Sequence, residues 1–140
     1  MSERVTHLLD TDICSHLMRK KPPEVVDRLR TLGPARVAVS VVTALELREG
    51  AELSRHPEEY HGRVDVFLAG IRPLPLPLEA AAAGGRLRAT LRRAGKPIGD
   101  LDALIATHAV ALGVVLVTSN VREFSRVEGL QWENWVRKAK

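Results

Sequence analysis

Short apolar runs alternate along this chain with longer segments of helical periodicity. The runs at residues 5–9, 37–41 and 114–118 are rich in Val and Leu, and they predict strands that are buried on both faces. Strands that alternate with helices favour a parallel sheet with helices on both of its faces. The chain has 140 residues and no internal repeat or linker, so residues 1–140 are predicted to form one α/β domain, a three-layer α/β/α arrangement around a mostly parallel central sheet.

Helices are expected between these strands, and Pro and Gly mark several of their ends. The predicted ranges are 13–19 (one turn or two), 22–32, 43–53, 64–68, 79–94 and 101–112. Residues 54–62 are polar and are interpreted as a frayed helix end or a loop. Residues 71–77 alternate proline with other residues, which allows only an edge strand or a very short one. A last short strand is expected at residues 130–132.

The chain lacks the sequence features of an exported or membrane-spanning protein. Its single cysteine, Cys14, excludes an internal disulfide and a cysteine-based zinc site. The longest apolar stretch, residues 109–117, is far too short to cross a bilayer. The first ten residues do not follow the charged-then-apolar pattern of a signal peptide. We therefore expect a cytoplasmic protein with no membrane segment.

Acidic residues stand where a basic protein has least electrostatic use for them. The chain has 21 Lys and Arg against 17 Asp and Glu, a net charge of +4, which permits a polyanionic partner. Yet Asp10 and Asp12 follow the first predicted strand, and Glu46 lies one turn into the helix after the second. Asp100 and Asp102 stand at the start of the helix that leads to the third. Ligands of open α/β sheets bind beyond these strand ends, so the five acids are predicted to converge there.

Carboxylates gathered in one place repel one another unless a cation neutralises them. Oxygen ligands without Cys or His suit Mg²⁺, with Mn²⁺ as an alternative. Taken singly, Asp10, Asp12 and Asp100 are also good turn or helix-capping residues. Taken together, and with Glu46 in an otherwise apolar helix start, they predict a metal site.

Four segments contain these acids and the polar residues around them. They are LDTDIC at 9–14, SVVTALEL at 40–47, PIGDLDALIATHA at 97–109 and LVTSNVREF at 116–124. In sequence and order they resemble the motifs of the PIN domain, and more narrowly those of the VapC toxins of bacterial toxin–antitoxin pairs. The resemblance extends from residue 8 to residue 135, almost the whole chain.

The resemblance implies a ribonuclease that cleaves RNA phosphodiester bonds with Mg²⁺. In the family, the positions that match Asp10, Glu46 and Asp102 hold the metal ion. Asp10 and Asp102 are expected to be direct ligands, and Glu46 either a ligand or the group that orients and deprotonates the attacking water. The ion would lower the pKa of that water and screen the charge that builds on the phosphoryl oxygens. One ion or two would be consistent with this chemistry.

Other polar residues of the four motifs are expected around the metal, as additional ligands or as residues that orient the ligands. They are Asp12, Asp100, Asn120, Glu123, Thr11, Thr118 and Ser119. Many relatives have Asn at the position of Asp12 and a neutral residue at that of Asp100. These two extra carboxylates leave open which acids contact the metal.

The resemblance also implies partners. Toxins of this family pair as homodimers and are silenced by an antitoxin protein whose tail enters the active site. The substrate would be RNA, and no membrane partner is expected. A basic side chain of the antitoxin would pair with the carboxylates of the site.

A basic helix precedes the last two acids of the predicted site. Residues 79–94 and the loop after them contain five cations: Arg86, Arg88, Arg92, Arg93 and Lys96. One interpretation is a phosphate-binding track that leads into the acidic site. The other is a solvated helix surface over a buried apolar side.

Two other functions fit parts of the pattern. A phosphatase of the haloacid dehalogenase type would use Asp10 as its nucleophile, but its last metal motif needs an acid where this chain has Ala103 or Leu104. A non-enzymatic α/β binding module would leave Glu46 unexplained.

Overall fold

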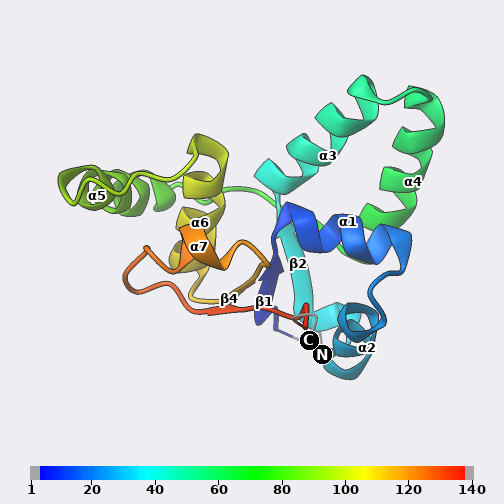
Figure 1. The fold of residues 1–140 in the computed structure, drawn as a ribbon, viewed down its shortest axis with the longest axis horizontal. Helices are drawn as coiled ribbons and strands as arrows, with labels where there is room; N and C mark the ends of the chain where they lie inside the picture. The colour runs from blue at the N-terminus through cyan, green and yellow to red at the C-terminus, as the bar shows by residue number, and fades with distance from the viewer. Residues whose placement is uncertain (1–3, 138–140) are drawn as a thin grey trace.

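The computed structural model describes residues 4–137, whose centre is a sheet of five parallel strands. The strands are β1 (His7–Leu9), β2 (Val37–Ser40), β3 (Pro73–Leu74), β4 (Val115–Val117) and β5 (Trp132–Glu133). Their order across the sheet is β3-β2-β1-β4-β5, so β1 lies in the middle with β2 and β4 on either side (Figure 1). The predicted three-layer class is confirmed, and every pairing in the described sheet is parallel.

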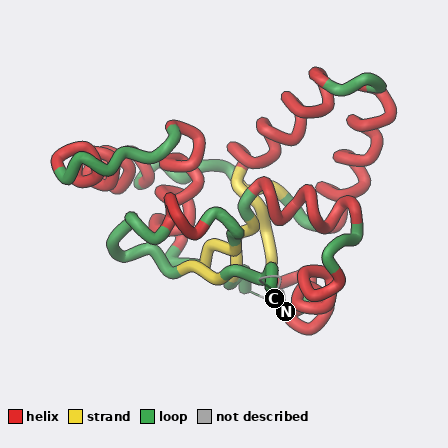
Figure 2. Tube along the Cα trace, viewed as in Figure 1, coloured by secondary structure: helices red, strands yellow, loops and turns green. Residues whose placement is uncertain are grey.

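Helices connect the strands and make up most of the chain (Figure 2). They are α1 (Thr11–Arg19), α2 (Pro23–Leu32), α3 (Val41–Leu53), α4 (Pro57–Gly70), α5 (Ala80–Arg93), α6 (Asp100–Leu112) and the short α7 (Val121–Phe124), with a 3₁₀ turn at Pro34–Arg36. None of the helices within residues 4–137 is long and apolar enough to cross a bilayer.

Alternate side chains of each strand point to opposite faces of the sheet, and each face has its own core. Leu9 and Val117 lie in a cluster with residues of α1 to α4. Leu8 and Leu116 lie in a second cluster with residues of α5 to α7, including the fully buried Phe124. Burial of each such large apolar side chain contributes about 1.5–3 kcal/mol relative to its exposure to water. Helices therefore pack on both faces of the sheet. The edge formed by the carboxyl ends of its strands lies between the two helical layers.

The helix after β2 and the one that follows it differ from the sequence prediction. α3 begins at Val41 instead of residue 43, because the Ser40 Oγ accepts the Val42 N–H at 3.1 Å and caps the helix. Residues 57–62, predicted as a loop or frayed end, belong to α4, so that prediction was wrong. Pro57 in the first turn favours a helix start, and the buried Val64 anchors α4 to the core. In Figure 1, α3 and α4 form a helical hairpin that extends from the sheet.

Both edge strands are short. β3 contains only two residues, Pro73 and Leu74, in agreement with the expected edge position of this proline-rich segment. β5 at the other edge spans residues 132–133 instead of 130–132.

Helices α5 and α6 pack closely where α5 contains Gly84. A Cβ at Gly84 would lie 3.0 Å from the Thr107 Cγ2 of α6, whereas a Cβ at the neighbouring Gly85 would have no atom within 4 Å. Gly84→Val is therefore expected to lower the free energy of unfolding by about 1–3 kcal/mol through overpacking. The matched change Gly85→Val meets no such atom and should raise it by a few tenths of a kcal/mol, about the difference in helix propensity between Val and Gly. Urea unfolding of the two variants checks the prediction, and equal effects would contradict it.

Candidate active site

The carboxyl ends of the three central strands meet at one edge of the sheet. Leu9 is in register with Val39 of β2 and with Val117 of β4, so the residues that follow these positions are neighbours. The Asp10 N–H continues the ladder by donating to the Val117 carbonyl at 2.8 Å. Parallel register thus brings together side chains that are far apart in the sequence.

Asp10 is the most deeply buried carboxylate of this edge, with 5% of its surface exposed. It caps α1, because its Oδ1 accepts the Thr11 N–H at 2.8 Å. Its Oδ2 accepts the Thr118 hydroxyl at 2.7 Å. Burial, and then the nearby negative charge of Asp12, raise the pKa of Asp10 from 3.8 to about 8 despite these hydrogen bonds. Asp10 therefore costs free energy when it is ionised without a neutralising cation.

Asp12 lies in the first turn of α1 and is bound to the loop after β4. Its Oδ1 accepts the Ile13 N–H at 2.9 Å. Its Oδ2 accepts both the Ser119 N–H, at 3.2 Å, and the Ser119 hydroxyl. The negative charge of Asp12 reaches both Asp10 and Asp102, whose pKa values it raises. Asp12 and Ser119 are thus part of the acidic site, and Ser119 fixes the orientation of Asp12.

Glu46 projects from α3 toward the start of α1. The Thr11 hydroxyl donates to the Glu46 Oε1 at 2.6 Å and lies 3.3 Å from the Thr43 Oγ1. The sequence alone could not fix the direction of Glu46, since Leu45 and Leu47 occupy other faces of the same helix. The hydrogen bond from Thr11 shows that it faces the acidic site.

Asp102 and Glu123 form a pair on the opposite side of the site, from α6 and α7. Burial is the largest cause of a rise in the pKa of Asp102 from 3.8 to about 7, followed by its hydrogen bond with Glu123 and the negative charge of that residue. The same hydrogen bond lowers the pKa of Glu123, because it stabilises the ionised form of that carboxyl. The Asn120 amide donates to the Glu123 Oε2 at 3.2 Å, and the Asn120 N–H donates to the Thr118 Oγ1 at 2.9 Å. Asn120 therefore connects this pair to the Thr118 that holds Asp10.

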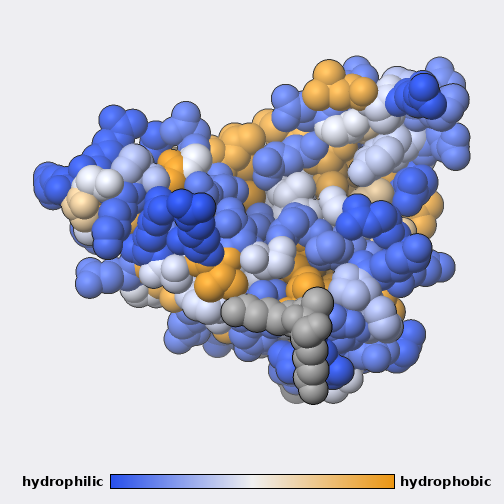
Figure 3. Space-filling view, in the orientation of Figure 1, coloured by the Kyte–Doolittle hydropathy of each residue, from blue (hydrophilic) through white to orange (hydrophobic). Residues whose placement is uncertain are grey.

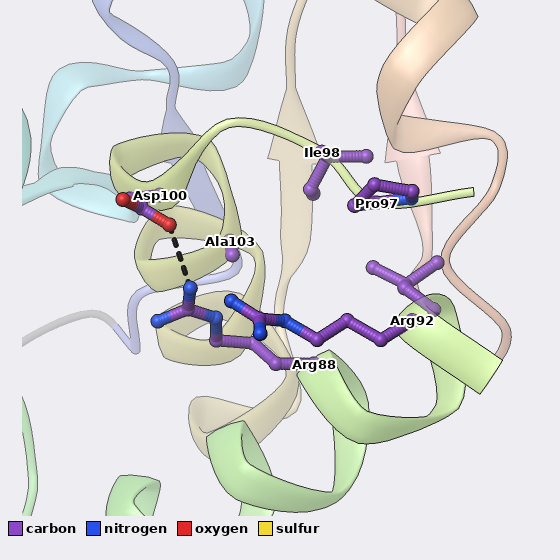
Figure 4. Close-up of a pocket in the computed structure, with 7 residues that line it drawn as sticks. Arg88, Arg92, Pro97, Ile98, Asp100 and Ala103 are labelled. Atoms are coloured by element: carbon purple, nitrogen blue, oxygen red, sulfur yellow. Dashed lines mark hydrogen bonds and ion pairs between the residues drawn. The ribbon is translucent and has the colours of Figure 1, made fainter. Parts of the chain in front are cut away.

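Asp100 is oriented differently from the other acids. Its side chain is 80% exposed, and its Oδ1 forms an ion pair with the Arg88 Nη2 at 2.6 Å (Figure 4). Residues two positions apart on a helix point to nearly opposite sides. Asp100 and Asp102 both belong to the first turn of α6, so their side chains diverge. Asp100 faces Arg88 of α5, while Asp102 faces Glu123 of α7.

The five cations expected to form one track lie on different sides of α5. Arg88 and Arg92, four residues apart, line a cavity beside Asp100. Arg86 and Lys96 line another cavity together with Arg126. Arg93 is exposed near the end of α5. This part of the surface is largely hydrophilic in Figure 3, and Figure 4 shows Arg88 and Arg92 on the same side of the cavity as Asp100.

One supporting contact has no signal in the sequence. The buried His108 of α6 forms a hydrogen bond of 2.7 Å through its Nδ1 with the Ser40 Oγ, which also caps α3. It therefore joins the helix that carries Asp102 to the helix that carries Glu46. His108 and Ser40 are 68 residues apart in the chain, and no spacing rule pairs them.

The donor set fits a hard divalent cation. The side chains that converge are carboxylates, hydroxyls and an amide, and oxygen ligands of this kind are those that Mg²⁺ and Mn²⁺ prefer. Cys14 is fully buried. Burial is the largest cause of the raised pKa of its thiol, and the charges of Asp10 and Asp12 raise the pKa further, so the thiol stays protonated. Among residues 4–137, no three acidic, histidine or cysteine side chains form a ready-made metal site. The site combines high negative charge density with hydrogen bonds that hold most of its carboxylates to neighbouring residues.

Thr11 is the hydrogen-bond donor that orients Glu46, and its replacement tests this role. Thr11→Val keeps the size of the side chain and removes the hydroxyl that donates to Glu46. We expect the affinity of the site for a divalent cation to fall by about 10–100-fold, the range for loss of a residue that orients a metal ligand. The control is Thr31→Val, at an exposed position of α2. A variant with wild-type affinity for the cation would show that Glu46 needs no such support.

Comparison with known proteins gives one consistent family. Residues 7–130 match the model of the PIN domain. The tRNA(fMet)-specific endonuclease VapC of Shigella flexneri is 41% identical over 128 residues, which make up 91% of this chain and 96% of that protein. Ribonuclease VapC2 of Haemophilus influenzae is 38% identical over 130 residues, 93% of this chain and 98% of that protein.

Solved structures agree with the sequence relatives. The crystal structure of DNA-bound VapBC from Salmonella typhimurium superposes with a TM-score of 0.89 and 37% identity, and covers 94% of this chain and 99% of that one. VapBC2 from Rickettsia felis, bound to a DNA fragment from its promoter, gives a TM-score of 0.87 at 32% identity, with 93% and 98% covered. The chain therefore belongs to the PIN domain family.

Proposed function

We propose that this protein is a divalent-metal-dependent endoribonuclease and the toxin of a toxin–antitoxin pair. The observation that carries the proposal is the group of acids at the carboxyl edge of a PIN-type sheet, where Asp12 raises the pKa of Asp10, and Glu46 and Asp12 both raise the pKa of Asp102. Relatives at 38–41% identity are named as ribonucleases or endonucleases, which supports the same reaction here. PIN nucleases generally use a divalent metal ion, and Mg²⁺ is our specific proposal, with Mn²⁺ as an alternative.

Asp10, Glu46 and Asp102 would hold the ion, and Asp12 and Glu123 would add negative charge around it. When bound, the ion supplies a water of lowered pKa and a positive charge beside the phosphoryl oxygens.

Hydroxyl and amide groups of neighbouring residues hold these carboxylates in fixed orientations. The Thr118 hydroxyl fixes the Oδ2 of Asp10, and the Thr11 hydroxyl fixes the Oε1 of Glu46. Glu46 is the carboxylate that can orient the attacking water and accept its proton. Ser119 and Asn120 hold Asp12 and Glu123 from the loop after β4. Preorganised groups of this kind need little rearrangement when charge develops at the phosphate.

We extend the proposal to substrate and partners. The Shigella flexneri relative is named as specific for tRNA(fMet), so we propose tRNA(fMet) as the first RNA to test. The solved relatives are VapBC toxin–antitoxin complexes, which supports an antitoxin protein as partner. We further propose a homodimer that acts in the cytoplasm, where the buried single Cys14 needs no disulfide partner.

The test of the proposed function is RNA cleavage by the purified protein. Wild type and Asp10→Asn are incubated with total cellular RNA and with tRNA(fMet), in Mg²⁺ and in excess chelator. Discrete fragments are expected from wild type in Mg²⁺ only. Equal cleavage by both proteins, or cleavage that persists in chelator, would contradict the proposal.

The family assignment favours this function over the two alternatives. A haloacid dehalogenase-type phosphatase would form an aspartyl phosphate on Asp10, and trapping of the purified protein with a phosphate mimic would reveal it. A binding module without activity would leave RNA intact under every condition of the cleavage assay.

A further inference from the structure

A cavity lies beside α6 on the side turned away from Asp102. Its volume is about 320 Å³, and Arg88, Arg92, Pro97, Ile98 and Asp100 line it (Figure 4). Asp100 and Asp102 are two positions apart on one helix, so they point to nearly opposite sides of it. The cavity and the acidic site therefore share one wall, the first turn of α6.

The charge inside this cavity is unbalanced. Arg88 pairs with Asp100 through a contact of 2.6 Å between Nη2 and Oδ1. Arg92, one turn further along α5, takes part in none of the ion pairs found among residues 4–137. In Figure 4 the two guanidinium groups lie beside each other, with a single carboxylate at the edge of the cavity. Two guanidinium groups against one carboxylate favour a bound anion, and Arg is the side chain that binds phosphate in a bidentate manner.

The walls of the cavity are held in place by the surrounding structure. Arg126 donates through its Nη1 to the Pro97 carbonyl at 3.1 Å and so fixes the loop between α5 and α6. The Lys96 N–H donates to the Leu91 carbonyl at 2.9 Å, where Leu91 is only 5% exposed. A loop held by such contacts has less conformational entropy to lose when a ligand binds.

We propose that the Arg88–Arg92 cavity binds a backbone phosphate of the RNA strand, next to the one that is cleaved. In the free protein Asp100 forms an ion pair with Arg88, and the phosphate replaces Asp100 when RNA binds. The proposal rests on the ribonuclease function proposed above and adds a substrate contact to it. An α-helix with its side chains is about 10–12 Å across, so a phosphate here is separate from the one beside Asp102. Asp100 is then a competitor of the substrate and not a ligand of the metal.

RNA binding tests the subsite independently of cleavage. In an Asp10→Asn background, the Kd of a labelled tRNA(fMet) is measured by fluorescence anisotropy over a series of salt concentrations. Adding Arg92→Ala should weaken binding by about tenfold and reduce the slope of log Kd against log salt by about 1, as expected for loss of one phosphate contact. Arg88→Ala should act in the same direction. The control is Arg30→Ala, which removes an exposed cation of α2 that pairs with Asp27.

Cleavage kinetics separate this subsite from the metal centre. With Asp10 intact, Arg92→Ala should raise KM and retain kcat, because the contact holds substrate and does no chemistry. Asp100→Asn should lower KM by about threefold, since it frees Arg88 for the phosphate. A tenfold or greater fall in kcat for Asp100→Asn would make Asp100 part of the metal centre and overturn the proposal.

The possible failures can be told apart. Equal Kd values and salt slopes for Arg92→Ala and Arg30→Ala would refute the subsite, while cleavage by wild type would still support the ribonuclease. Absence of any metal-dependent cleavage would refute the ribonuclease, whereas the binding assay would still report on the subsite. Unchanged RNA binding together with weakened binding of an acidic peptide would assign the cavity to a protein ligand and overturn the proposal.

Discussion

Asp10→Asn should abolish RNA cleavage and, in the same protein, raise the stability of the metal-free fold at pH 7. The two effects have one cause. Asp10 is 5% exposed, and burial and the charge of Asp12 raise its pKa to about 8. A neutral amide removes the cost of keeping a proton or an unpaired charge in this position. It also removes the negative charge that a metal ion needs.

The expected size of each effect follows from the burial of Asp10. Cleavage should fall by more than about 100-fold, the upper end of the loss when only a residue that orients a ligand is removed. The free energy of unfolding in chelator should rise by about 1–3 kcal/mol, less than the full pKa shift implies, because the amide must also satisfy Thr11 and Thr118. Cleavage of RNA and urea unfolding measure the two effects.

The control for this variant is Asp27→Asn, which neutralises an exposed acid of α2. It should leave the rate of RNA cleavage unchanged and alter the free energy of unfolding by no more than about 0.5 kcal/mol. An Asp10→Asn protein that is less stable than wild type in chelator would show that the hydrogen bonds of Asp10 outweigh its burial. An Asp10→Asn protein that still cleaves RNA would remove Asp10 from the active site.

Metal-free wild type should lose stability as the pH rises from 4 to 8, and a divalent cation should restore it. A carboxyl whose pKa is higher in the folded state binds its proton more tightly there, so its stabilising contribution is complete below the unfolded pKa of 3.8. That contribution is lost as the pH rises through the folded values, about 7 for Asp102 and about 8 for Asp10. A cation that takes the place of these protons reverses the loss, and its effect grows with pH.

Thermal unfolding at several pH values, in chelator and in Mg²⁺, measures this linkage. At a Mg²⁺ concentration 100 times its Kd, the gain should be about 2.7 kcal/mol, or several degrees in Tm. Other groups titrate in the same range, so the informative quantity is the difference between wild type and Asp10→Asn at each pH. A difference that does not change with pH, or a gain from Mg²⁺ that is equal in both proteins, would contradict the prediction.

The sheet could be predicted from sequence because its strands are fully buried. The Val-rich segments around Val39 and Val117 can satisfy both helical layers only as central strands. The parallel register of Leu9 with these two residues then places Asp10 beside Thr118 without further information. The register alone predicts this contact, whereas the directions of Glu46 and Asp100 depend on the packing of α3 and α6. The roles of the acids as metal ligands stay predictions.

The parts that could not be predicted depend on side chains far apart in the sequence. The start of α6 was expected at Leu101, which would leave Asp100 in a loop and free to turn toward Asp102. The helix begins one residue earlier, and Arg88 of α5 then forms an ion pair with Asp100. Likewise, α4 includes residues 57–62 because the α3–α4 hairpin buries Val64, a tertiary effect that overrides the polar composition of that segment.

The Thr118 hydroxyl that holds Asp10 is 108 residues further along the chain. During synthesis, a ribosome-bound fragment that ends before β4 has β1 and β2 but lacks the second neighbour of β1, and it also lacks Asn120 and Glu123. Proteins leave the ribosome N-terminus first, at about 5–20 residues per second, so the site stays incomplete until residues 115–123 have emerged. Topology therefore delays assembly of the acidic site until β4 and the loop after it can pair with β1.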